Sequence, residues 1–302
     1  MSTLQIKENK ILQRNELCWC GSGKKYKKCH ADYDERISEM KFDFFKGQVR
    51  PPRKVINNAQ DIAGIRAAGI INDGALDLMD EMVKPGITTA ELDQAVYDYI
   101  IGHGAIPGDL NYEGFPNSCC TSINDIVCHG IPSKKVKLQE GDIINVDVTT
   151  VLNGYYADAS RMYMVGKVSP AAERLVRVTK ECMEAGVAAA RAWHFVGDIG
   201  AACAKVAHEN GYGVVTDLGG HGVGKGYHID PFVSHNAKPE TGMLLVPGMT
   251  LTVEPMINEG TFKVFTDKTG DGWTVRTKDH KLSAQWENTI LITETGIEVL
   301  AH

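Results

Sequence analysis

The chain has 302 residues, of which 43% are hydrophobic and 23% are charged, and its formal net charge is −6. This composition is typical of a folded globular protein and excludes a largely disordered chain. The first ten residues lack the apolar stretch of a secretion signal, and no apolar run reaches the roughly 18 residues that a bilayer span needs, so we expect a cytoplasmic protein.

The charges are unevenly distributed along the chain. Residues 1–54 hold 13 Lys and Arg against 7 Asp and Glu, whereas the remaining residues hold 19 against 31. Local positive charge attracts phosphate whatever the charge of the whole chain, so the basic segment is a candidate for docking to an anionic partner. The alternative is a solvated extension that only aids solubility.

The first motif in chain order is CWCGSGKKYKKCH, at residues 18–30. It offers three cysteines and a histidine as ligands: Cys18, Cys20, Cys29 and His30. Three thiolates and an imidazole are donors of a closed structural zinc site. The spacing resembles the SEC-C zinc motif at the end of the bacterial translocation ATPase, although Trp19 stands where a proline is usual. We therefore expect one structural zinc ion in a small domain at residues 1–46.

A second, larger domain is expected at residues 55–302. A Pro-Pro pair at residues 51–52 lacks amide donors and marks a linker at residues 47–54. The first helix of the larger domain is predicted at about residues 59–83, where apolar side chains recur at intervals of three and four until a Pro-Gly pair stops the pattern.

Three further helices are predicted from their start and stop signals. A capping box at residues 88–91 starts the second helix, which ends at Gly102 to Gly104. Ser169 caps the third, which runs to about Ala192, and the fourth follows Gly197-Asp198 and stops at Gly211. Short β-branched runs with turn signals between the helices predict antiparallel strands.

An internal repeat relates the two halves of the larger domain. Adding 107 to a position gives its counterpart, and the matched pairs are Glu91 and Asp198, Gly104 and Gly211, Gly141 and Gly248, and Asp147 and Glu254. The segments at residues 140–147 and 247–254 each place a glycine turn before a strand that ends in a carboxylate. A duplication predicts two halves that face each other across a pseudo-twofold axis, with both carboxylates at the centre. A chance match is the alternative.

A β-hairpin is predicted around Asn153-Gly154, because both residues tolerate the positive φ of a tight hairpin turn. This register places Thr149 opposite Asp158. Asp147 shares a face with Thr149, since strand side chains alternate in twos. Two carboxylates on one apolar hairpin repel each other unless a cation lies between them. The alternative is that one of them is protonated or points to solvent.

Three further groups extend this pair of aspartates into a candidate metal centre. Glu254 ends a strand, Glu287 lies beside the apolar run TILIT, and His221 lies in the glycine-rich segment LGGHGVGKGYHIDP. Four carboxylates and one imidazole suit Mn, Fe, Co or Zn, and the abundance of carboxylate favours two ions with shared ligands. His228, in the same segment, is a candidate for contacting substrate. His129, at a strand-to-loop transition, is by itself better explained as an ordinary surface or core histidine.

Six segments in chain order resemble the type I methionine aminopeptidases, which have the pita-bread fold: TSINDIVCHGIP, INVDVT, YYADASRMY, GGHGVGKGYHIDP, LTVEPMI and SAQWENTILIT. The resemblance covers about residues 55–300. It implies an α+β fold of two duplicated halves, with antiparallel sheets backed by helices. It also implies hydrolytic removal of the N-terminal methionine from nascent proteins when the second residue is small.

The resemblance assigns roles by position. It implies two divalent ions, of Co, Mn, Fe or Zn, with a nucleophilic water between them and five ligands: Asp147, Asp158, His221, Glu254 and Glu287. It implies that His228 polarises the scissile carbonyl, that His129 lies near the scissile amide, and that Glu254 also shuttles protons. The implied methionine pocket is soft and aromatic: Tyr112, Phe115, Cys120, Tyr227 and Trp273. Phe115 stands where some members have tyrosine, and Ala159 where threonine is frequent, which leaves fine specificity open.

An enzyme that acts on emerging chains gives the basic zinc motif a function. Its four lysines, Lys24, Lys25, Lys27 and Lys28, make docking to the ribosome our hypothesis, with a salt-sensitive attraction to phosphate. A folding or solubilising appendage is the alternative. The related bacterial enzymes lead us to expect a monomer.

Two other functions are compatible with the sequence. Aminopeptidase P and prolidase share this metal set and would act at proline, but they usually carry a large N-terminal domain in place of the short segment found here. A metal-free pita-bread protein that binds peptides or RNA is the other alternative, and the presence of all five ligands argues against it.

Overall fold

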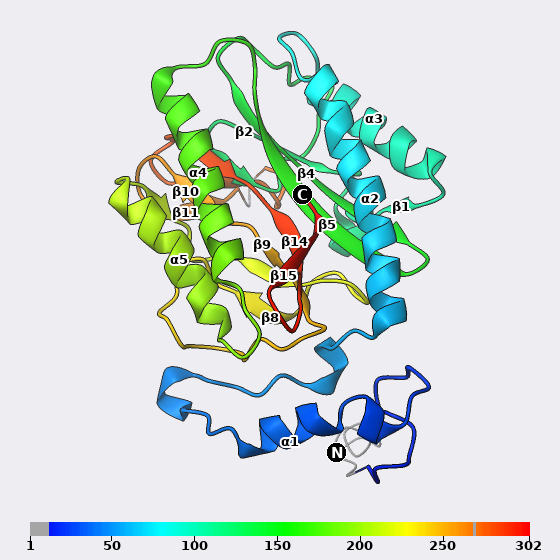
Figure 1. Ribbon diagram of the computed structural model, residues 1–302. Coiled ribbons are helices and arrows are strands. Elements are labelled where there is room, and N and C mark those ends of the chain that lie inside the picture. The colour runs from blue at the N-terminus through cyan, green and yellow to red at the C-terminus, as the bar shows by residue number, and fades with distance from the viewer. Residues whose placement is uncertain (1–11, 268–269) are drawn as a thin grey trace.

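The computed structural model describes residues 12–267 and 270–302 (Figure 1), so the first eleven residues of the predicted zinc-binding domain lie outside the described residues. The α-helices in these ranges are α1 (Ala31–Glu39), α2 (Ala59–Met82), α3 (Thr89–Gly102), α4 (Pro170–Ala189) and α5 (Val196–Glu209). Short 3-10 helices lie at Tyr26–Lys28, Phe44–Lys46, Arg53–Val55 and Tyr112–Gly114. Among the residues described, none of the helices combines the length and apolarity that crossing a bilayer requires.

Capping side chains fix where α2 and α3 begin. The Asn58 side chain accepts hydrogen bonds from the backbone of Gln60 and Asp61, and the Asp61 side chain accepts one from Asn58 in return. Thr88 and Glu91 form the predicted capping box at the start of α3. These bonds satisfy amide donors that the first turn of a helix leaves unpaired. The first two predicted helices are confirmed.

The third and fourth predicted helices are confirmed with shifted ends. Ser169 caps α4 as predicted, but α4 ends at Ala189, three residues before the expected end. The prediction that α5 follows Gly197-Asp198 is wrong by one turn, since α5 begins at Val196. The Asp198 side chain accepts from the backbone of Phe195, so this acid caps the helix from inside its first turn.

In the part of the chain that the structure describes, the strands form four sheets. Every pairing between named strands is antiparallel, which confirms the predicted strand arrangement. The first sheet contains β1 (Ile106–Pro107), β2 (Cys120–Ile123), β4 (Ile143–Leu152) and β5 (Tyr155–Met164). The second contains β7 (Gly220–Gly222), β8 (Ile229–Val233), β9 (Thr250–Val253), β14 (Asn288–Ile292) and β15 (Ile297–Ala301). The third sheet contains β6 (Gly213–Val214), β10 (Met256–Asn258) and β13 (Ser283–Gln285). The fourth contains β3 (Ile126–Cys128), β11 (Val264–Thr266) and β12 (Val275–Thr277). A bridge between Ser160 and Glu287 joins the first sheet to the second.

The hairpin of β4 and β5 has the predicted turn and register. Asn153 and Gly154 have φ values of 52° and 83°, and Thr149 pairs with Asp158. The expectation that the strand ends at Asp147 is wrong, because β5 pairs with β4 along its whole length and β1 pairs with its far end. Glu254, in contrast, directly follows the last residue of β9.

The two halves share local geometry at the offset found in the sequence. Gly104 and Gly211 have φ values of 73° and 80°, and Gly141 and Gly248 have φ values of 97° and 91°. In Figure 1, α2 and α3 lie on one side of the central strands, and α4 and α5 lie on the other. The two large sheets therefore belong to halves of similar design that meet near the Ser160–Glu287 bridge.

The N-terminal segment lies along one end of the larger domain (Figure 1). Tyr33 of α1 contacts Trp193, with ring centroids 5.9 Å apart. The backbone of Val49 bonds to Gly242 and Leu244 at 3.0 Å each. The segment expected as a linker is thus held against the larger domain by backbone pairing.

Candidate functional site

One cavity of about 400 Å³ lies at the junction of the two large sheets. Its walls include the candidate ligands from both halves: Asp147 on β4, Asp158 on β5, His221 on β7, Glu254 after β9, and Glu287 before β14. The same cavity is lined by the other candidate residues of the larger domain: Tyr112, Phe115, Cys120, His129, Tyr227, His228 and Trp273. Residues far apart in the sequence therefore meet in one place.

His221 lies among the acidic side chains. Its Nε2 is 3.5 Å from Asp158 Oδ2 and 3.6 Å from Glu254 Oε1. One ligand atom from each of Asp158, His221 and Glu287 lies within 4.8 Å of the other two. Asp147 and Glu254 also lie close enough to Glu287 for their charges to raise its pKa. The structure thus brings together the five side chains that the sequence grouped.

The described residues that line the cavity include these four acids but no lysine or arginine to offset their charge. Burial, followed by the charge of Asp158, raises the pKa values of Asp147 and Glu287 well above their ordinary range. Burial also raises the pKa of Glu254 to about 7. Glu287 Oε1 is buried and has no hydrogen-bond partner among the described residues. Buried carboxylates in this situation are costly unless a cation binds them, so the donor set fits divalent metal ions.

The orientation of His221 is set by its strand. Its Nδ1 lies 3.1 Å from the Gly222 carbonyl oxygen, so Nδ1 carries the proton and the lone pair of Nε2 faces the carboxylates. A side chain on Gly222 would place its Cβ 2.0 Å from the backbone oxygen of Asp230. Glycine is therefore required beside His221 because the neighbouring backbone approaches so closely.

His228 lies on the loop between β7 and β8. Its Nδ1 is 3.0 Å from the Tyr112 hydroxyl, and its ring stacks on Tyr227 with centroids 4.0 Å apart. Burial, followed by the charge of His221, lowers the pKa of His228 to about 4, so the ring is neutral near pH 7. A neutral imidazole that accepts the tyrosine proton at Nδ1 presents an N–H at Nε2.

His129 has an unusual backbone conformation at the end of β3. Its φ is 55°, in the left-handed region that non-glycine residues rarely adopt. Its ring meets Trp273 edge to face, with centroids 6.1 Å apart, and burial lowers its pKa. Such strained residues concentrate at functional sites, which separates His129 from an ordinary structural histidine.

Apolar side chains form another part of the cavity wall. Phe115 and Cys120 are buried, and the Phe115 ring meets Trp273 with centroids 5.2 Å apart. Met256 and Phe232 also line the cavity and were not among the residues predicted from the sequence. An apolar residue within a motif gives no sign of which way it faces, so no sequence signal identified these two.

Several polar groups behind the cluster were also missed. Thr252 Oγ1 donates to Glu254 Oε1 at 2.7 Å, and Gln285 Nε2 donates to Glu254 Oε2 at 3.2 Å. Asp109 accepts from the Tyr227 hydroxyl at 2.8 Å. Thr252 lies two positions before Glu254, and the alternation of strand side chains is a signal that predicts its position. Gln285 and Asp109 come from other elements and leave no local signal.

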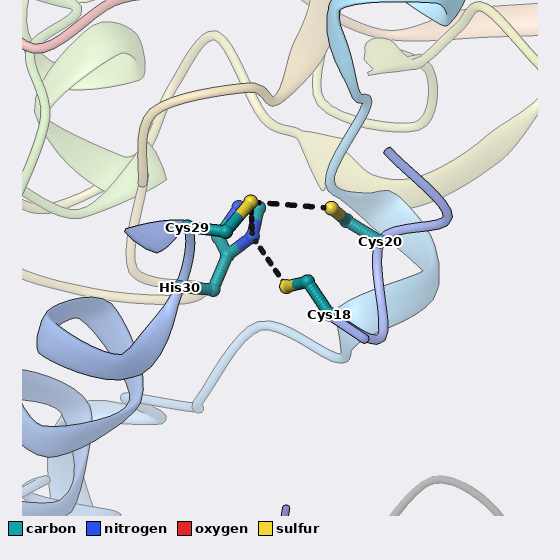
Figure 2. A group of neighbouring side chains, drawn as sticks. All are labelled: Cys18, Cys20, Cys29 and His30. Carbon is teal, nitrogen blue, oxygen red and sulfur yellow. Dashed lines mark hydrogen bonds between the residues drawn. The ribbon is translucent and has the colours of Figure 1, made fainter. Parts of the chain in front are cut away.

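Figure 2 shows the side chains of Cys18, Cys20, Cys29 and His30 pointing toward one another. The sulfur atoms of Cys18 and Cys29 each lie 3.2 Å from His30 Nδ1, and those of Cys20 and Cys29 are 3.5 Å apart. Ligands about 2.0–2.3 Å from a tetrahedral zinc ion are separated by roughly 3.5 Å. All four cysteine and histidine donors lie within 4.8 Å of one another and the cysteines are free thiols, so the cluster fits a zinc ion.

Both the larger domain and the N-terminal motif match known protein families. The model of metallopeptidase family M24 matches residues 63–294, and that of the SEC-C motif matches residues 14–32. Methionine aminopeptidase A of Synechocystis sp. is 50% identical over 242 residues, which cover 80% of this chain and 94% of that protein.

Solved structures show the same similarity. The methionine aminopeptidase of Rickettsia prowazekii has a TM-score of 0.80 and 45% identity, covering 82% of this chain and 99% of that chain. The methionine aminopeptidase of Thermotoga maritima has a TM-score of 0.79 and 35% identity, covering 81% of this chain and 98% of that chain.

Proposed function

The chain belongs to metallopeptidase family M24, among the methionine aminopeptidases of pita-bread fold, and from this premise we propose how its cavity removes the N-terminal methionine from proteins. The observation that carries the proposal is the convergence of four acids and His221 in a cavity that also has an apolar, aromatic wall. A proline-directed peptidase is disfavoured because relatives up to 50% identical are methionine aminopeptidases.

We assign the metal ligands to the five groups around the cavity centre: Asp147, Asp158, His221, Glu254 and Glu287. The abundance of carboxylate favours two ions with shared ligands, of Co, Mn, Fe or Zn. Divalent ions bound there supply an activated water at neutral pH and a Lewis acid for the scissile carbonyl. The unpartnered Glu287 oxygen and the buried acids support this assignment.

The remaining roles fall to side chains that face the cavity. His228 donates its Nε2 proton toward the scissile carbonyl oxygen, where negative charge develops. Its neutral state and its contact with Tyr112 support that role. His129 donates to the scissile amide or orients it. Glu254 takes a proton from the attacking water and passes it to the leaving amine.

The apolar wall binds the methionine side chain in this proposal. Phe115, Cys120, Tyr227 and Trp273 offer aromatic rings and a thiol, surfaces that suit a flexible thioether. The following residue passes beside the rings of His228 and Tyr112, which contact each other. We therefore propose a preference for a small second residue.

Peptide cleavage and metal analysis test this function. We expect cleavage of Met-Ala-Ser, much slower cleavage of Met-Leu-Ser, and none of Ala-Pro peptides, with divalent metal in the purified protein. Glu254→Gln should lower kcat by at least about 10²-fold with an unchanged circular dichroism spectrum, because proton transfer is lost while the volume is kept. Activity equal to that of the unaltered enzyme would contradict the assigned role.

We further propose that Cys18, Cys20, Cys29 and His30 hold one structural zinc ion and that the adjacent lysines dock on the ribosome. The exposure of Lys24, Lys25, Lys27 and Lys28 supports docking through phosphate groups. Replacing these four lysines by glutamate should abolish cosedimentation with ribosomes, and higher salt should weaken it in the unaltered protein. Replacement of the exposed Lys134 and Lys135 serves as a control.

A further inference from the structure

The loop that carries Tyr227 and His228 is held at both ends by residues near the start of the larger domain. Lys225 Nζ lies 3.1 Å from Asp61 Oδ2, and Asp230 Oδ2 lies 3.4 Å from Lys54 Nζ. The two ion pairs bracket the loop on either side of its aromatic rings. Lys54 also lines a hollow of about 420 Å³ together with His228, so its side chain lies close to the proposed catalytic residue.

Asp61 is a fixed anchor for this loop. Its side chain is buried, and its Oδ2 accepts from the backbone of Asn58 at 3.0 Å while its Oδ1 accepts from the Tyr155 hydroxyl at 3.3 Å. On the loop itself, the flexible residues Gly224 and Gly226 flank Lys225, and the Gly224 carbonyl oxygen accepts from the backbone of Tyr156 at 2.7 Å. The ion pair of Lys225 with Asp61 adds a side-chain restraint to the loop beside this backbone bond.

Residues next to Asp61 and Lys54 also contact the N-terminal zinc motif. Asn58 Nδ2 donates to the carbonyl oxygen of Cys20 at 2.9 Å. Arg53, next to Lys54, forms an ion pair of 2.6 Å with Asp34, which also accepts from Trp19 Nε1 at 3.1 Å. The residues that hold the loop thus lie on a segment packed against the N-terminal motif.

We infer that Lys54 and Asp61 are positioning residues for His228, and that the N-terminal segment helps to build the active site. The inference rests on the proposed role of His228. The two ion pairs keep the loop in the conformation in which the His228 ring stacks on Tyr227 and the His228 side chain lines the cavity. Loss of both pairs releases the loop and moves His228 away from the scissile carbonyl.

The test uses Lys225→Met and Lys54→Met, singly and combined, in the full-length metal-loaded enzyme. Lys225→Met leaves the capping bonds of Asp61 intact, and the ion pair of Lys54 with Asp230 is exposed on both sides and contributes little to folding, so the variants should fold. We expect the double variant to lose about fivefold in kcat on Met-Ala-Ser with little change in KM, because only the transition-state contact of His228 is displaced. Lys225→Arg keeps the cation, so using it in place of Lys225→Met in the double variant should restore kcat.

Two further measurements separate positioning from a general structural effect. In a His228→Ala background, the double variant should cause no additional loss of kcat, since the residue it positions is gone. Hydrogen exchange of the amides at residues 224–230 should accelerate in the double variant. Arg66→Met, which breaks the ion pair of α2 with Glu298, is the matched control and should change neither quantity.

The outcomes of these experiments distinguish a failure of this inference from a failure of the proposed function. An equal loss of kcat with and without His228, or unchanged exchange at residues 224–230, would overturn the inference. If His228→Ala by itself leaves kcat intact, the proposed role of His228 fails, and accelerated exchange in the double variant would still show that the ion pairs restrain the loop.

Discussion

Thr252 connects two of the proposed metal ligands through one hydroxyl group. Its Oγ1 accepts from the backbone of His221 at 3.0 Å and donates to Glu254 Oε1 at 2.7 Å. The side chain is fully buried, so water cannot replace it. Contacts of this kind orient metal ligands and hold their lone pairs toward the ion.

Removal of this hydroxyl should therefore weaken metal binding without damage to the fold. Thr252→Val keeps the shape of the side chain, and we expect metal affinity to fall about 10- to 100-fold, with kcat reduced at subsaturating metal. Metal titration by calorimetry measures the change. Thr252→Ser keeps the hydroxyl and should bind metal nearly as well as the unaltered protein; equal losses in both variants would show that the hydroxyl is irrelevant.

Individual residues of the site differ in how well the sequence predicts them. Asp147 and Asp158 follow from strand alternation and the turn at Asn153-Gly154, which are local properties. The contacts of Gln285 and His235 with Glu254 come from separate elements, and only the folded chain brings them together.

At the scale of secondary-structure elements, β7 is a strand that the local propensities of its residues do not predict. No strand was predicted for the glycine-rich segment from the sequence, whereas residues 220–222 form the strand between β8 and β9. Glycine disfavours strands in isolation. A Cβ on Gly220 would lie 2.5 Å from the Thr252 backbone oxygen, so the close packing of three strands selects glycine and also imposes the strand. Helix starts and the β4–β5 register were predictable because caps and turns act locally.

Substitution within β7 should consequently be severe. Gly222→Ala forces the strands apart, and we expect a loss of at least about 2 kcal/mol in the free energy of unfolding and of most activity. Denaturant titration measures the first quantity. Gly296→Ala is the control, because no described residue other than its chain neighbours lies within 4 Å of a Cβ at that position. Similar stabilities for the two variants would refute the packing argument.

At the scale of the whole molecule, the N-terminal motif packs on the larger domain. Trp19, Tyr33 and Trp193 form a chain of ring contacts from one to the other, with centroids 6.1 Å and 5.9 Å apart. Trp19 and Tyr33 also pack against the core of the second half. Zinc bound at the motif would therefore stabilise the protein beyond the motif itself.

Loss of one zinc ligand should reveal this connection. We expect Cys29→Ser to remove one equivalent of zinc from the purified protein, with the exchangeable active-site ions retained, and to lower Tm. Elemental analysis and thermal unfolding provide the two measurements. Cys203→Ser, at a buried cysteine remote from the motif, controls for thiol loss, and an unchanged zinc content in Cys29→Ser would rule out the proposed structural site.

The bridge between Ser160 and Glu287 lies where the two halves meet, and the candidate metal centre lies at the same boundary. One half contributes two aspartates, and the other contributes a histidine and two glutamates. Neither half alone carries all five proposed metal ligands. An ancestor of half this length would have needed two copies to assemble a comparable centre, and fusion of the copies into one chain would have freed each side to specialise.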